Sequence, residues 1–188
     1  MREYIKLILL NLVIYYVAFN LQDIEILEIN LASEQLVANL EINIVEAKMA
    51  EPKTNQDITW NYLKNKGLTD IQVAAIMGNI EQESRFITGA IESNGEGIGL
   101  IQWSFTRKAN YLNFAKGKND IYTQLDYLWH ELTECYMWTS GYEKIFYNSN
   151  SVEECTKAFC WGFERPSVKY ANINYRIQMA NYYYNIYN

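Results

Sequence analysis

The chain has 188 residues, a length that suits one globular domain with a smaller appendage. Its 16 Lys and Arg residues are outnumbered by 22 Asp and Glu residues, and the net charge of −6 argues against a nucleic-acid-binding protein, which would present a basic face. Hydrophobic residues make up 49% of the chain and aromatic residues 15%, enough to build a packed core and to exclude a wholly disordered chain.

The acidic charge is concentrated in the first quarter of the chain. Residues 1–52 contain 3 basic and 8 acidic side chains, a net charge of −5, which leaves −1 for residues 53–188. We interpret residues 23–52 as an acidic spacer, whose apolar positions fit a helix and a strand equally well. Pro52 then marks the predicted boundary to a separate domain.

The beginning of the chain has the pattern of an export signal. Arg2 and Lys6 precede residues 7–19, which are apolar except for Asn11. A basic start before such a run is typical of a signal peptide or membrane anchor, which we place at residues 1–22. Membrane anchoring would use residues 5–21, and a buried amphipathic helix is the alternative. Because no clean cleavage site follows the run directly, a cleaved signal and a retained anchor both stay open.

Helix signals dominate residues 53–188. Thr69 and Ser151 each begin a capping box, a pattern that opens helices. A long glycine-bearing loop at residues 85–103 has room for a small hairpin, and we expect a mainly α fold. In chain order, helices are predicted over residues 56–66, 70–84, 104–116, 120–138, 151–163 and 170–187.

The cysteines and the histidine do not have the pattern of a metal site. The 3 Cys and the single histidine, His130, lack the spacing of a zinc site, so we expect no metal and no cofactor. Cys155 and Cys160 lie five residues apart on a predicted helix, which disfavours a disulfide between them, whereas one from Cys135 to either stays open. We interpret the cysteines mainly as buried apolar residues and His130 as a packed or surface residue.

Two carboxylates lie at the edges of the apolar face of the predicted helix 70–84. That face carries Val73, Ile76, Met77 and Ile80. Glu83 lies at one edge and Glu81 at the other, and periodicity does not choose between them. A carboxyl group that is partly buried can stay protonated near neutral pH, as a general acid for glycoside cleavage must.

Three motifs make the chain recognisable. They are Gly78-Asn79-Ile80-Glu81-Gln82-Glu83-Ser84, then Gly97-Ile98-Gly99-Leu100-Ile101-Gln102-Trp103 with Arg107, and finally Phe163-Glu164-Arg165-Pro166. In this order they resemble the phage tail lysozyme family, which includes muramidase domains of phage tail proteins and of cell-wall hydrolases on conjugative elements. Goose-type lysozymes and lytic transglycosylases are more distantly similar. The resemblance covers roughly residues 56–187 and implies a lysozyme-like helical domain at residues 53–188.

The resemblance also implies roles for particular residues. It selects Glu83 as the catalytic acid, because in that family the acid is the glutamate that precedes serine. Gln102 and Trp103 belong to the strip that lines the sugar groove, where Trp103 would stack on a pyranose ring. Ser84 is included among the substrate-binding residues, as a cap or orienting group for Glu83. The segment Glu164-Arg165-Pro166 is interpreted as structural, through an internal ion pair and a helix stop. Arg107 is interpreted as a brace.

The implied activity is cleavage of the β-1,4 bond between N-acetylmuramic acid and N-acetylglucosamine, with peptidoglycan as the partner. A hydrolase needs a second carboxylate, for which Glu92 and Glu96 are available, whereas a lytic transglycosylase needs none and forms anhydro-muramyl products. A non-catalytic peptidoglycan-binding or structural tail or surface protein is the third alternative. We expect a secreted or membrane-anchored protein facing the cell wall, associated with a phage or mobile element. The sequence sets no oligomeric state, and among 16 tyrosines it does not single out Tyr170 or Tyr175 as groove residues.

Overall fold

The computed structural model divides the chain into two units, Met1–Pro52 and Lys53–Asn188. The described residues are 9–17, 19, 21, 31–42, 53–135, 137–139 and 141–188. In the first unit, residues 9–17 and 31–42 are helical. Among the described residues, no helix is long and apolar enough to cross a membrane. The basic start, much of the predicted acidic spacer and the predicted boundary at Pro52 lie outside the described residues.

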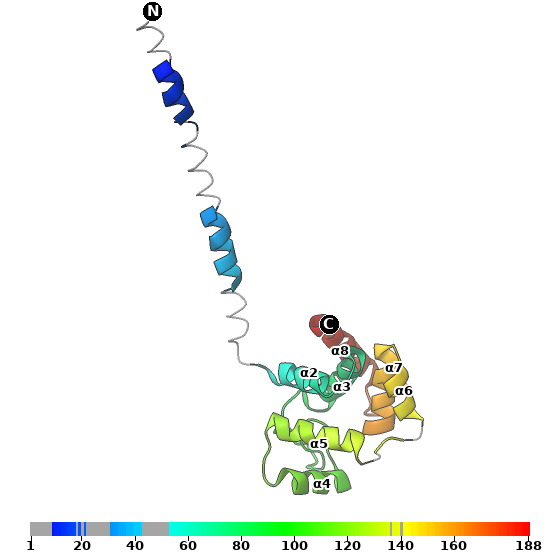
Figure 1. Ribbon diagram of the computed structural model, residues 1–188. Helices are drawn as coiled ribbons and strands as arrows, with labels where there is room; N and C mark the ends of the chain where they lie inside the picture. The colour runs from blue at the N-terminus through cyan, green and yellow to red at the C-terminus, as the bar shows by residue number, and fades with distance from the viewer. Residues whose placement is uncertain are drawn as a thin grey trace, which may run out of the picture. The chain divides into compact units, whose positions relative to one another are not determined.

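The second unit is built from helices, which confirms the mainly α prediction for this part of the chain (Figure 1). In chain order these are α2 (Asn55–Asn65), α3 (Asp70–Ser84), α4 (Phe105–Ala115), α5 (Ile121–Thr133), α6 (Tyr142–Asn148), α7 (Val152–Ala158), the π-helix η1 (Phe159–Glu164) and α8 (Ile173–Tyr187). The helix predicted over residues 120–138 ends early, at Thr133, and α6 was not predicted. Within residues 85–103 the only β pairing is two isolated bridges that share Ile98, so no hairpin of regular strands forms there.

Helix α3 is the centre of this unit and lies against α2, α7, η1 and α8. It opens with the predicted capping box, in which the Thr69 hydroxyl accepts from the Gln72 backbone N–H and the Gln72 side chain accepts from the Thr69 N–H. The predicted apolar face is buried in the core. Arg85, at φ 53°, ends the helix in the left-handed conformation directly after Ser84.

Helices α3 and α8 lie side by side because Gly78 has no side chain (Figure 1). A Cβ at position 78 would lie 2.4 Å from the carbonyl oxygen of Arg176 and 2.7 Å from the Cβ of Ala180. Only glycine permits this approach. The contact places Arg176 of α8 beside the last turns of α3, where Glu83 lies.

The glycine-bearing loop is fastened to α5 by the buried side chain of Gln124. Its Oε1 accepts from the backbone N–H of Leu100 at 2.7 Å, and its Nε2 donates to the carbonyl oxygen of Thr88 at 2.8 Å. Gly99, at φ +72°, allows Gln124 to come close, because a Cβ there would lie 2.6 Å from Oε1. The two ends of the loop are therefore held together beside the end of α3.

The histidine and the cysteines carry no reactive arrangement. All three cysteines are in the described part of the chain and are free, so the disulfide left open for Cys135 is not formed. Cys155 and Cys160 are buried, as predicted, whereas Cys135 is exposed. His130 lies 3.0 Å from a carboxylate oxygen of Glu134, the residue that caps α5, and packs on neighbouring rings, in agreement with its interpretation as a packed residue.

Candidate functional site

Glu83 lines a cleft of about 380 Å³ in the second unit. The walls come from the end of α3, the glycine-bearing loop, the start of α4, the end of η1 and the segment that leads into α8. The lining residues are Gln82, Glu83, Glu92, Ile101, Gln102, Ser104, Arg107, Glu164, Arg165, Pro166, Ser167, Tyr170 and Arg176. The fold thus brings all three recognised motifs to one cleft, although they are far apart in the sequence.

Glu83 is held in place by a buried arginine. Nη2 of Arg176 donates to Oε1 of Glu83 at 2.5 Å, and the two side chains are 1% and 18% exposed. Arg176 is itself fixed, because Nη1 donates to Oδ1 of Asn79 at 2.9 Å and Nε donates to the carbonyl oxygen of Ala171 at 2.6 Å. Such a bonded guanidinium gives the Glu83 carboxyl group a defined position at the edge of the cleft.

The other carboxylate at the edge of α3 has a different place. Glu81 accepts a hydrogen bond of 2.7 Å from the hydroxyl of Tyr183 and does not line the cleft. The tertiary structure therefore separates the two glutamates that helical periodicity left equivalent.

Trp103 does not face the cleft, and the prediction that it stacks on a sugar is wrong. Its side chain is 0% exposed and lies against the ring of Tyr111, with ring centroids 4.5 Å apart. The indole N–H donates to Oε2 of the buried Glu131 at 2.7 Å. A ring enclosed in this way has no free face for a pyranose, so Trp103 acts in the core.

Arg107 is a structural brace, as predicted, and its partner is the buried Glu131. Nε and Nη2 of Arg107 donate to the two carboxylate oxygens of Glu131 at 2.9 and 2.8 Å. The Arg107 guanidinium also lies over the ring of Phe163, 5.0 Å from its centroid. This two-point bond ties α4 to α5 beneath the cleft.

Glu164 was interpreted as structural, yet its carboxyl group lines the cleft. Its side chain is 3% exposed, and Oε2 lies 3.7 Å from Nη1 of Arg107. Oε1 is buried and has no hydrogen-bond partner among the described residues. Burial and the nearby charge of Glu83 raise the pKa of Glu164 to about 8. The helix-stop interpretation is confirmed, because Arg165 ends η1 at φ 58°.

The π-helical turn explains how Glu164 reaches the cleft. The Arg165 N–H bonds to the carbonyl oxygen of Cys160, five residues back, at 2.7 Å. This wider turn changes the direction in which the last side chain of η1 points, compared with a continued α-helix. Nothing in the sequence pattern distinguishes such a turn from an ordinary helix end, so the position of Glu164 was missed.

The remaining predicted residues divide between cleft and core. Gln102 lines the cleft, with Nε2 bonded to the Gly99 carbonyl oxygen at 2.9 Å. Ser84 does not, because it is buried and its hydroxyl donates to the Ile80 carbonyl oxygen at 3.4 Å. It therefore neither contacts the cleft nor orients Glu83, contrary to the prediction. Of the two candidates for a second carboxylate, Glu92 lines the cleft and Glu96 does not.

The sequence-based predictions missed Arg176, which lines the cleft, and Glu131, which holds Arg107. The buried residues of α8 are Arg176, Ala180 and Tyr183, spaced like the apolar stripe of a helix. Glu131 likewise lies among the buried residues of α5. A charged residue at a buried helix position must find a partner inside the protein. A charged residue at such a position is therefore the sequence signal that could have predicted these two ion pairs.

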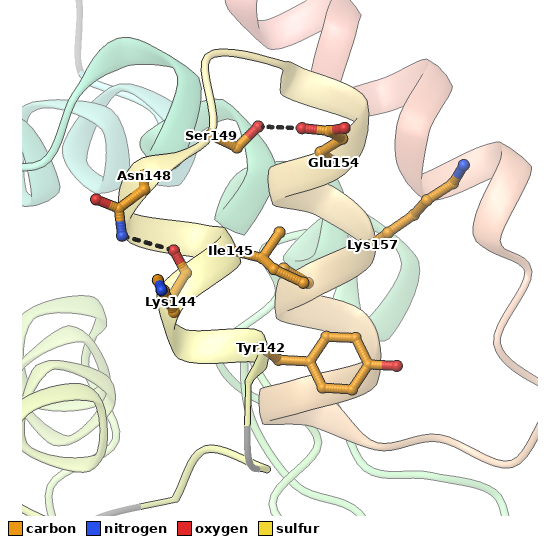
Figure 2. Close-up of a pocket in the computed structure, with 8 residues that line it drawn as sticks. Tyr142, Lys144, Ile145, Asn148, Ser149, Glu154 and Lys157 are labelled. Atoms are coloured by element: carbon orange, nitrogen blue, oxygen red, sulfur yellow. Dashed lines mark hydrogen bonds between the residues drawn. The ribbon is translucent and has the colours of Figure 1, made fainter.

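A larger cavity, of about 520 Å³, lies between α6 and α7 (Figure 2). It is lined by Tyr142, Lys144, Ile145, Asn148, Ser149, Glu154, Lys157 and Ala158. Its polar side chains bond to their own surroundings: Ser149 donates to Glu154 at 2.6 Å, and the Asn148 amide donates to the Lys144 carbonyl oxygen at 2.7 Å (Figure 2). Since no buried carboxyl group lines this cavity, the cleft at Glu83 is the better candidate for chemistry.

Comparison with known proteins points to the same part of the chain. Residues 54–187, which include every residue of the cleft, match the model of the family described as phage tail lysozyme. The chain is also similar to Morphogenesis protein 1 of Bacillus phage B103, with 26% identity over 132 residues. That alignment covers 63% of this chain and 36% of the phage protein, so the similarity spans about a third of that relative.

Proposed function

Because this chain belongs to the phage tail lysozyme family, we propose that its second unit cleaves peptidoglycan glycan strands, with Glu83 as the general acid. The bond cleaved is the β-1,4 linkage between N-acetylmuramic acid and N-acetylglucosamine. Family membership supports peptidoglycan cleavage in general. The assignment of Glu83 rests on one observation: of the two edge carboxylates of α3, only Glu83 lines the cleft.

In this proposal Glu83 donates its proton to the glycosidic oxygen as the bond from that oxygen to the anomeric carbon breaks. The bond electrons go to the leaving sugar, and the positive charge that develops on the other sugar is stabilised by the carboxylates that line the cleft. Gln102 is placed to hydrogen-bond sugar hydroxyl or acetamido groups. Tyr170, which lines the cleft and is 67% exposed, replaces Trp103 as the aromatic surface for a sugar ring.

We propose hydrolysis rather than transglycosylation, because further carboxyl groups share the cleft with Glu83. Hydrolysis requires a group that accepts a proton from the attacking water, and Glu164 and Glu92 both line the cleft. A lytic transglycosylase uses the muramyl 6-hydroxyl as the nucleophile and releases an anhydro sugar. Mass spectrometry of the digested muropeptides distinguishes the two, because transglycosylase products are lighter by one water and lack a reducing end.

The catalytic assignment is tested with Glu83→Gln and the matched variant Glu81→Gln. We expect Glu83→Gln to lower the rate of peptidoglycan cleavage by about 10²- to 10⁴-fold, since glutamine cannot supply the proton. Glu81→Gln keeps an acceptor for Tyr183 and lies outside the cleft, so it should cleave at nearly the wild-type rate. Thermal unfolding of all three proteins controls for folding. Equal cleavage by wild type and Glu83→Gln would remove Glu83 from the mechanism, and binding without cleavage by wild type would indicate a non-catalytic module.

A further inference from the structure

Carboxyl and guanidinium groups line the cleft in equal numbers, three of each. The residues that carry them are Glu83, Glu92, Glu164, Arg107, Arg165 and Arg176. A charged group that is already bonded within the protein contributes little to the recognition of a ligand, because it would first have to give up its partner. The contacts of the three arginines therefore indicate which positive charge is free to bind a substrate.

Two of the three arginines are bound to carboxylates of the protein. Arg176 donates to Oε1 of Glu83 at 2.5 Å, and its side chain is 1% exposed. Arg107 donates to both carboxylate oxygens of Glu131, and its Nη1 lies 3.7 Å from Oε2 of Glu164. The Arg107 side chain is 15% exposed. These two guanidinium groups are used inside the protein and are not free to bind a ligand.

Arg165 differs from the other two arginines. It is exposed and lines the cleft, and its guanidinium forms no ion pair or hydrogen bond with the described residues, Glu92 included. The internal ion pair expected for Glu164-Arg165-Pro166 is therefore not made by Arg165. The backbone of Arg165 is held in place, because its N–H donates to the Cys160 carbonyl oxygen at 2.7 Å and the rigid ring of Pro166 follows. Arg165 thus supplies an unpaired positive charge at a fixed point of the cleft wall.

The same part of the wall carries the aromatic ring proposed for sugar binding. Arg165, Ser167 and Tyr170 all line the cleft and belong to the segment between η1 and α8. N-acetylmuramic acid differs from N-acetylglucosamine by a 3-O-lactyl ether, which ends in a carboxyl group that is either free or joined to the stem peptide. A guanidinium group binds a carboxylate through two parallel N–H···O bonds. The unpaired arginine therefore matches the part of the glycan that N-acetylglucosamine lacks.

We propose that Arg165 binds a carboxylate carried on the lactyl side of the muramyl sugar, and that it thereby selects peptidoglycan over neutral glycans such as chitin. This inference rests on the proposed function, because it takes peptidoglycan as the ligand of the cleft. The carboxylate is that of the lactyl group itself in a glycan without peptide, or one of the stem peptide. Arg165 contributes to binding and not to the chemical step, so its effect belongs to affinity and KM.

The ligand preference is measured by calorimetric titration with the disaccharide N-acetylglucosaminyl-β-1,4-N-acetylmuramic acid. This disaccharide lacks the bond that is cleaved, so it binds without reacting. Three forms are compared: the free lactyl acid, its neutral methylamide and its conjugate with L-Ala-D-Glu. We expect the wild type to bind at least one of the two acids about three- to tenfold more tightly than the methylamide, and Arg165→Gln to bind all three equally. The acid whose affinity depends on Arg165 identifies the source of the carboxylate.

Arg85→Gln is the matched control for Arg165→Gln. Arg85 is also exposed and also follows a helix in the left-handed conformation, at φ 53°, but it does not line the cleft. Arg85→Gln should therefore keep the wild-type preference, and thermal unfolding of all three proteins controls for folding. The inference is wrong if the wild type does not distinguish the acids from the methylamide, or if Arg165→Gln keeps the preference. An equal loss in both variants would also contradict it, because it would show an effect of overall charge.

Kinetics separate this inference from the proposed function. With soluble peptidoglycan fragments, Arg165→Gln should raise KM about three- to tenfold and leave kcat nearly unchanged, because the contact is made equally before and during bond cleavage. A lower kcat with unchanged KM would contradict recognition by Arg165. If the wild type bound the acids through Arg165 but cleaved nothing, the proposed function would be wrong and the recognition would stand. Cleavage without a preference that depends on Arg165 would give the opposite result.

Discussion

The ion pair between Glu83 and Arg176 joins a partly exposed carboxylate to a fully buried guanidinium. Removing one partner of such a pair leaves a buried charge uncompensated, which typically costs about 3–5 kcal/mol of stability. For this reason glutamine is the most conservative substitution at position 83: it keeps an oxygen that accepts from Arg176, while it removes the negative charge together with the exchangeable proton. An alanine there would confuse loss of catalysis with loss of structure.

Tyr170 should have the sugar-binding role that the motif suggests for Trp103, and Trp103 should act on stability instead. Trp103→Phe removes the N–H donor to the buried Glu131, and we expect about 1–3 kcal/mol lower stability with unchanged affinity for a chitooligosaccharide. Tyr170→Ala removes an exposed ring from the cleft, and we expect unchanged stability with about three- to tenfold weaker binding. Urea unfolding and fluorescence titration measure the two quantities. If a fully folded Trp103→Phe bound the chitooligosaccharide more weakly, Trp103 would be a sugar-binding residue after all.

At the scale of elements, the contact between α3 and α8 builds the site. Three consecutive residues at the end of α3 bond to α8 or its N-terminal cap: Glu81 to Tyr183, Gln82 to Asn172 and Glu83 to Arg176. These bonds form only because the helix backbones approach closely at Gly78. The geometry of the cleft therefore depends on a glycine that does not line it.

Gly78→Ala should disturb both the fold and the site. The new methyl group would overlap the Arg176 backbone, and because backbone cannot move aside cheaply we expect a loss of about 1–3 kcal/mol or more. Gly89→Ala is the matched control, since a Cβ there meets nothing within 4 Å and its φ is not in the left-handed region. The midpoints of urea unfolding compare the variants. If Gly78→Ala were as stable as Gly89→Ala, the close packing of α3 on α8 would be in doubt.

At the scale of the whole molecule, most of the net negative charge belongs to residues 1–52, whereas the cleft belongs to residues 53–188. Of the net charge of −6, residues 1–52 carry −5 and residues 53–188 carry −1. A nearly neutral second unit gains little from long-range electrostatic attraction to or repulsion from a charged wall polymer. Within this unit, the charges that matter are the few buried ones around the cleft, where water does not screen them.

The raised pKa of Glu164 should make the stability of the protein depend on pH. The native pKa is raised to about 8 from the ordinary 4.5, so between these values the folded state binds more protons than the unfolded state. The free energy of unfolding should therefore fall as the pH rises from about 5 to 8. Asp57 and Asp120, whose pKa values are lowered, titrate below this window. In Glu164→Gln the part of this pH dependence that comes from Glu164 should vanish, which urea midpoints at several pH values would reveal. An equal pH dependence in both proteins would contradict the raised pKa of Glu164.

The sequence by itself determined the helical framework and the order of the motifs. The capping box at Thr69 and the buried spacing of Val73, Ile76 and Ile80 are local patterns, so they predicted α3 from its own residues. The resemblance in three motifs likewise located Glu83 and Gln102, both of which line the cleft. These predictions are correct for one reason: each rests on residues that are neighbours in the sequence or on a motif of consecutive residues.

Only the tertiary structure decided what the polar side chains near Glu83 do. The contacts of Trp103 with Glu131, of Glu83 with Arg176 and of Glu164 with Arg107 join residues far apart in the chain. No periodicity within one helix encodes such pairs, because they depend on how closely whole helices approach. Whether a charged group is paired, unpaired or exposed is set by that approach, and its pKa depends on which of these it is.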